Sequence, residues 1–103
     1  MAASYTVVFA PEAAAEVTAI TAWWHKNRQA APGLFQQELK QALLNIAAYP
    51  GIGVRAKMPA DPDVRAVVLR RSGYVVFYDI DHGETEIQVV RVRHSKRRPL
   101  KRR

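Results

Sequence analysis

The chain of 103 residues contains no cysteine. Disulfide bonds, thiolate metal sites and cysteine nucleophiles are therefore excluded, which fits a reducing compartment. No apolar run approaches the roughly 18 residues that a membrane-spanning helix needs. The first residues, MAASYTVVF, also lack the basic segment and long apolar stretch of a secretion signal. We therefore expect a cytoplasmic protein.

Several catalytic signatures are missing as well. The sequence has no glycine-rich phosphate loop. Its histidines, His25, His82 and His94, are scattered over a predicted helix end, a turn and a strand end, and no pair has metal-ligand spacing. The acids of the second half lie mainly in predicted turns, where they do not form a catalytic pair. We expect no metal and no cofactor.

Acidic residues are absent from the C-terminal end of the chain. None follows Glu86, whereas eight of the 16 basic residues fall between Arg91 and Arg103. Up to Val54 three basic and three acidic residues cancel, so the net charge of +7 arises after that point. Such a concentration of positive charge attracts nucleic acid, an acidic protein surface or an anionic membrane. The alternative interpretation is a solvated tail that binds no partner.

Hydrophobic periodicity predicts two helices and four strands. Pro11 and Glu12 suit the first turn of a helix, and Pro50-Gly51 ends the second helix. The helices are predicted over residues 11–27 and 34–49, and the strands over residues 5–9, 64–70, 74–80 and 86–93. One helix carries an apolar stripe of Ala13, Val17, Ile20 and Trp24, and the other a stripe of Phe35, Leu39, Ala42, Leu43 and Ile46. Residues 52–63, with one glycine and two prolines, are predicted as a loop.

The predicted elements combine into one α+β domain. Ser72-Gly73 and His82-Gly83 predict tight turns between the last three strands. In the last strand we expect Ile87 and Val89 on one face and Val90 and Val92 on the other. Two helices with a short connection form a hairpin that must cover one face of a mostly antiparallel sheet. The prediction is a single two-layer sandwich over residues 1–103, with the order β-α-α-β-β-β and a basic tail at residues 95–103.

The candidate site is the basic end of this sheet. Guanidinium groups pair with phosphate or carboxylate in a fork, which favours an anionic target. His94 could act there as a general acid or base, or it could form only local hydrogen bonds. The predicted target-binding residues are Arg70, Arg71, Arg91, Arg93, His94, Lys96 and Arg97.

Three features together resemble the RelE/ParE superfamily, the toxins of type II toxin–antitoxin modules. They are the order of elements, the Tyr49-Pro50-Gly51 after the second helix, and the GYVVFYDI and IQVVRVRHSKR of the last two strands. The resemblance covers about residues 5–98. No single motif is decisive, but the combination is fairly specific.

The two branches of this superfamily imply different mechanisms. RelE-like members cleave mRNA on the ribosome with Lys, Arg and a late Tyr or His. They typically carry an arginine where this chain has Val75, and often lysines where it has Ala66 and Val68. No tyrosine follows Tyr78, so a late tyrosine cannot stack on a base.

The ParE-like branch is the closer match. Its members resemble this chain in the apolar third strand, Val75-Val76-Phe77-Tyr78, and in the ending Val92-Arg93-His94. They poison DNA gyrase without an accepted active site, and so inhibit growth and serve in plasmid stabilization. The resemblance therefore implies a non-catalytic gyrase inhibitor. The alternatives are a ribosome-dependent mRNA endonuclease that uses His94 and the arginines, and a basic nucleic-acid-binding module.

The same resemblance implies a cognate antitoxin and no membrane partner. A small antitoxin with an acidic C-terminal segment would lay a helix against the helical hairpin. Adjacent Trp23 and Trp24 present more aromatic surface than one buried stripe uses, although both indoles could pack on the second helix. The predicted antitoxin-binding residues are Val17, Ile20, Trp23, Trp24, Phe35 and Leu39.

Overall fold

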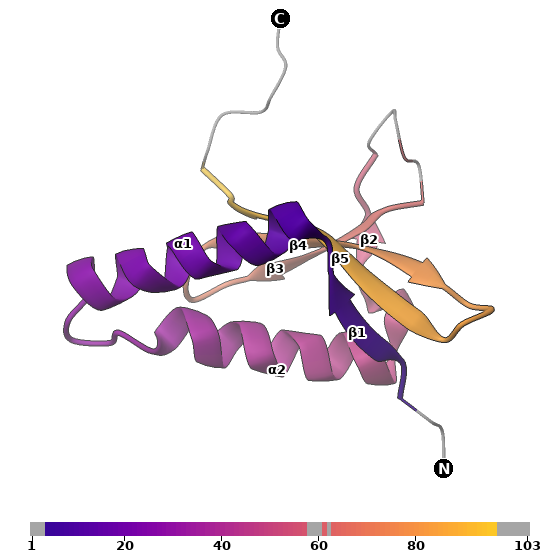
Figure 1. The fold of residues 1–103 in the computed structure, drawn as a ribbon, viewed down its shortest axis with the longest axis horizontal. Coiled ribbons are helices and arrows are strands. Elements are labelled where there is room, and N and C mark those ends of the chain that lie inside the picture. Colours follow the sequence, from indigo (N-terminus) through magenta and orange to yellow (C-terminus); the bar gives the residue numbers. More distant parts are fainter. Residues whose placement is uncertain (1–3, 58–60, 62, 97–103) are drawn as a thin grey trace, which may run out of the picture.

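The computed structural model describes residues 4–57, 61 and 63–96, and Figure 1 shows how the elements are arranged. Both helices follow a short first strand, and the other strands occupy the second half of the chain. No helix in this described part is long and apolar enough to span a membrane. In chain order the elements are β1 (Thr6–Phe9), α1 (Pro11–Asn27), α2 (Leu34–Ala48), the 3-10 helix η1 (Pro50–Ile52), β2 (Val54–Arg55), β3 (Arg65–Leu69), β4 (Tyr74–Asp81) and β5 (Glu86–His94).

Five strands form one sheet in the order β1-β5-β4-β3-β2. β1 runs parallel to β5, and all other neighbouring strands are antiparallel. α1 and α2 run side by side and pack on one face of the sheet (Figure 1). The predicted α+β sandwich is confirmed, with β2 as an addition. β2 has only two residues, too few for an alternating pattern, so its segment is predicted as a loop.

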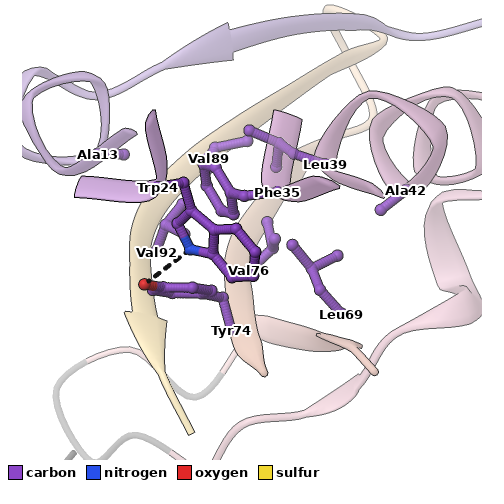
Figure 2. Close-up of a cluster of buried hydrophobic side chains, with 10 residues drawn as sticks. All are labelled: Ala13, Trp24, Phe35, Leu39, Ala42, Leu69, Tyr74, Val76, Val89 and Val92. Atoms are coloured by element: carbon purple, nitrogen blue, oxygen red, sulfur yellow. Dashed lines mark hydrogen bonds between the residues drawn. The ribbon is translucent and has the colours of Figure 1, made fainter. Parts of the chain in front are cut away.

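The core lies between the helices and the sheet. Phe35 and Tyr74 meet edge to face with ring centroids 5.0 Å apart, and Trp24 Nε1 donates to the Tyr74 hydroxyl at 3.4 Å (Figure 2). The main cluster consists of Ala13, Trp24, Phe35, Leu39, Ala42, Leu69, Tyr74, Val76, Val89 and Val92. A second cluster is formed by Ile46, Tyr78 and Ile87. The apolar stripes predicted for both helices therefore face the sheet.

β5 contains one extra residue, Val90, relative to β4. On β4 Phe77 pairs with Arg91, and the next residue already pairs with Val89. This bulge shifts the alternation of side chains by one position. Val92, 1% exposed, therefore points into the core on the same side as Val89. The expectation that Val92 lies on the opposite face is wrong, because the sequence here has no glycine or proline to mark a bulge.

The segment after α2 is fastened to the sheet by Tyr78. The Tyr78 hydroxyl donates to the carbonyl of Pro50 at 2.6 Å and accepts the N–H of Gly53 at 2.9 Å. The side chain is 0% exposed, and this burial raises the pKa of Tyr78. A Cβ on Gly53 would lie 2.6 Å from the hydroxyl oxygen, so only glycine fits. The proline-glycine segment after α2 thus serves the fold by anchoring η1 and β2.

Candidate functional site

The basic end of the sheet forms where the β3–β4 turn meets the end of β5. Gly73, with a φ of 87°, donates its N–H to the carbonyl of Leu69 at 2.7 Å and so closes the turn. Its own carbonyl accepts the N–H of Ser95, also at 2.7 Å. The structure therefore brings five predicted residues to one end of the sheet, namely Arg70, Arg71, Arg93, His94 and Lys96. Arg97 lies outside the described residues.

His94 is engaged in local contacts. Its ring meets the ring of Tyr74 edge to face at 5.0 Å, and its Nδ1 accepts the backbone N–H of Lys96 at 3.1 Å. An accepting ring nitrogen carries no proton, so in this arrangement the proton of a neutral His94 is on Nε2. A Cβ on Gly73 would lie 3.0 Å from Nε2, so the glycine makes room for the ring. Among the described residues no carboxylate hydrogen-bonds to His94, so it lacks the carboxylate partner that supports a general base in many catalytic sites.

Arg91 is joined to α1 by Glu16. β1 pairs only with the first part of β5, and α1 packs on β5 beyond that point. Glu16 Oε1 accepts the N–H of Val92 at 2.8 Å, and Glu16 Oε2 contacts Arg91 Nη2 at 2.8 Å and Nε at 2.9 Å. The hydrogen bond with Glu16 raises the pKa of Arg91. The guanidinium of Arg91, a predicted target-binding residue, is thus held against α1, although the register places Arg91 beside Phe77.

Glu38 of α2 holds the β3–β4 turn in a similar way. Its two carboxylate oxygens accept the backbone N–H groups of Arg71 at 2.7 Å and Ser72 at 2.8 Å. Burial acts to raise the pKa of Glu38, but these hydrogen bonds outweigh it and the pKa is lowered. The carboxylate therefore fixes the turn that presents Arg70 and Arg71.

Sequence reasoning missed both of these glutamates. Glu16 and Glu38 each follow a buried residue, Ala13 and Phe35, by three positions. They therefore stand beside the apolar stripes of their helices, where an isolated acid needs a partner. That placement is the signal that could have identified them as contacts to the sheet.

The sheet face turned away from the helices is apolar in its middle, and we call it the outer face. Its side chains alternate with those of the buried Val76 on β4 and Leu69 on β3. Cross-strand partners share a face, so the register assigns to this middle region Val54, Ala66, Val68, Val75 and Phe77. Val68 is 53% exposed and Val54 is 70% exposed. Arg93 pairs with Val75 and borders the region at the basic end.

The residues predicted to bind an antitoxin divide into two groups. Trp24, Phe35 and Leu39 belong to the buried core. Trp23, by contrast, is 43% exposed, and the guanidinium of Arg28 lies 4.8 Å from its ring centroid. The two tryptophans therefore have different roles, one in the core and one at the surface.

Two grooves flank α1. One of about 310 Å³ lies between α1 and the end of β5 and is lined in part by Ile20, Trp23 and His94. The other, of about 510 Å³, is largely apolar and lies between α1, α2 and β1, with Val17 and Leu39 in its wall. Four of the six predicted antitoxin-binding residues thus line one groove or the other.

Comparison with known proteins gives a family and a shared fold. The sequence matches the family model of the ParE toxin of type II toxin–antitoxin systems, parDE, over residues 7–99. No curated protein is similar enough to count as a match. A chain of the ParDE system of P. aeruginosa superimposes with a TM-score of 0.71 at 18% identity, covering 90% of this chain and 98% of that one.

Two RelBE complexes contain similar chains. The E. coli RelBE toxin–antitoxin complex gives a TM-score of 0.62 at 24% identity, covering 91% of this chain and 100% of that one. A chain of the RelBE2 toxin–antitoxin complex of Mycobacterium tuberculosis gives a TM-score of 0.60 at 21% identity, covering 91% of this chain and 94% of that one. Because these identities are below 25%, the solved structures show only that the fold is shared. The family model matches most of the sequence and therefore shows the family. The chain belongs to the ParE toxin family of type II toxin–antitoxin systems.

Proposed function

We propose that this toxin inhibits DNA gyrase through a protein contact, without a catalytic site of its own. The observation that carries the proposal is the composition of the outer face. By the resemblance described above, Ala66, Val68 and Val75 take positions at which RelE-like toxins often carry lysines and an arginine. Val68 pairs with Val75, and Ala66 is two residues away on the same strand. Aliphatic side chains cannot bind RNA phosphates or stabilise the charge that develops during phosphodiester cleavage.

The surroundings of His94 support the same proposal. A histidine that acts as a general base needs an unprotonated ring nitrogen within reach of the substrate. His94 uses Nδ1 for the N–H of Lys96 and packs its ring on Tyr74. These contacts account for His94 as a residue that closes the end of the sheet.

A cognate antitoxin completes the proposed module. Similar toxin folds occur in the E. coli RelBE complex and in the ParDE system of P. aeruginosa. The apolar groove between α1, α2 and β1 suits the apolar stripe of a helix. On the other side of α1, the exposed ring of Trp23 offers an aromatic anchor. An acidic antitoxin segment would neutralise the basic end of the sheet.

Induction of the chain in cells tests the proposal when DNA and mRNA are followed in parallel. Gyrase inhibition predicts double-strand breaks and an SOS response while mRNA stays intact. Coexpression of the antitoxin encoded beside the gene should restore growth. Rapid codon-specific cleavage of mRNA before any DNA damage would overturn the proposal.

A ribosome-dependent endonuclease is the second candidate, because Arg93, His94 and the turn arginines lie together at one end of the sheet. If His94 were its acid–base group, His94→Ala would reduce mRNA cleavage on the order of 100-fold. Under the gyrase proposal the same variant keeps its effect on DNA. Salt-sensitive nucleic-acid binding with neither DNA breaks nor mRNA cleavage would instead identify a plain binding module.

A further inference from the structure

We propose that the target protein docks on the outer face of the sheet and places an aliphatic segment over Val68, Val75 and Phe77, with a carboxylate beside the basic end. This inference rests on the proposed function, because it takes the target to be a protein. It adds where the contact lies and which chemistry the partner must present.

Folding of this chain does not account for the apolar side chains on the outer face. The main core cluster contains Val76 and Leu69 from the opposite face of the same strands, and it includes neither Val68 nor Val75. Val68, the fourth of the five residues of β3, is 53% exposed and pairs with Val75 of β4. Exposed apolar residues that adjoin one another across strands are typical of a protein-binding surface.

Charge is graded along the outer face. Beyond the apolar middle, toward the β4–β5 turn, the register places Asp79, Asp81 and Glu86. At the other end lie Arg93 and the turn residues 70–71. A partner that sets acidic residues against the basic end and basic residues against the acidic end is held in one orientation. The face therefore has an apolar centre with charged ends of opposite sign.

The chemistry of the centre favours a protein over RNA. Single-stranded RNA is held by aromatic rings that stack on bases and by cations along the backbone. The middle of the outer face offers one aromatic ring, Phe77, among four aliphatic side chains. Arg91 pairs with Phe77 on the same face, but its guanidinium is bound to Glu16 of α1. Aliphatic surface bordered by arginine matches the composition of protein interfaces, whose centres are depleted of charge.

The chain is large enough to provide a protein interface of ordinary size. A stable interface buries about 800 Å² on each partner. That value is a little over a tenth of the 7010 Å² accessible surface. The outer face, extended over the basic turn, is the region where apolar and charged contacts could be made together.

The test is inhibition of purified gyrase by the full chain and by Val68→Glu. A charge buried at the centre of an interface should raise the half-inhibitory concentration by roughly 30-fold or more. The matched control is Ile52→Glu, which adds the same charge at a residue of η1 that is 48% exposed. η1 is bound by Tyr78 from the helix side of the sheet, so this control should inhibit like the unchanged chain. Thermal unfolding verifies that both variants fold.

The variant Val68→Lys distinguishes a protein partner from RNA on the outer face. On a protein-binding centre lysine weakens inhibition as glutamate does, whereas on an RNA-binding face it would preserve or strengthen binding to RNA. Unchanged inhibition by both Val68 variants would overturn the docking surface while leaving gyrase inhibition intact. If the unchanged chain does not inhibit gyrase at all, the proposed function fails first. A dimeric unchanged chain with a monomeric Val68→Glu would show that a second copy covers the face, and would also overturn the inference.

Discussion

Both faces of the sheet carry apolar side chains, but this chain buries only those of one face. On the helix side Val76, Tyr78 and Ile87 are 0% exposed. On the outer face Val68 is 53% exposed, and Val75 and Phe77 are half-buried. Burial explains the apolar residues of the first face. Those of the second face contribute less to folding than an equal area in the core would, which is why we assign them to binding.

Truncation of one residue on each face gives the largest expected contrast. Ile87→Ala should lower the free energy of unfolding by about 2–5 kcal/mol, because it leaves a cavity in a fully buried site. Val68→Ala should change it by no more than about 0.5 kcal/mol, as at an exposed position. Urea unfolding of both variants measures the difference. Equal losses would mean that the outer face is needed for stability.

The second largest effect is expected from removing the hydroxyl of the buried Tyr78, compared with removing that of an exposed tyrosine. Tyr78→Phe leaves the buried N–H of Gly53 without its partner, and should cost about 1–3 kcal/mol of unfolding free energy. Tyr49→Phe, at a residue that is 70% exposed, is the control and should have little effect. Denaturant melts of the two variants compare them, and similar stabilities would show that η1 is not held by Tyr78.

The carboxylate of Glu38 should make stability depend on pH. Its pKa is lowered in the folded state, so ionised Glu38 contributes stability above the ordinary carboxyl pKa. That contribution is lost as the pH falls through the lowered value. The chain should therefore be more stable than Glu38→Gln at neutral pH, and this difference should shrink at an acidic pH below the lowered pKa of Glu38. Unfolding curves at both pH values test it, and a difference that stays constant with pH would contradict it.

Removal of a turn charge should produce the smallest effect. Arg70 is exposed at the rim of the outer face, so Arg70→Ser should mainly slow association with the target and weaken its salt dependence. Arg28→Ser, at the residue that follows α1, removes an equal charge away from this rim and should leave the association rate unchanged. Association kinetics at several salt concentrations provide the measurement. A large change in the dissociation rate would contradict this prediction and would show that Arg70 lies in the centre of the contact.

Periodicity was sufficient to predict both helices and four strands, because each carries a stripe or an alternation set by its burial. It could not give the bulge at Val90, since one extra residue leaves no local mark in a run of valines. The basic end was predictable because its basic residues lie at or just after the ends of predicted strands. The pairing of Arg91 with Glu16 was not, because it joins residues 75 positions apart that meet only after α1 packs on β5.

Supercoiling by purified DNA gyrase, measured while the purified chain is titrated, tests the central claim most directly. A ribosome-bound mRNA incubated with the same preparation reports any cleavage. The proposed function predicts loss of supercoiling with the mRNA intact. Full supercoiling activity together with ribosome-dependent cleavage of the mRNA would contradict it.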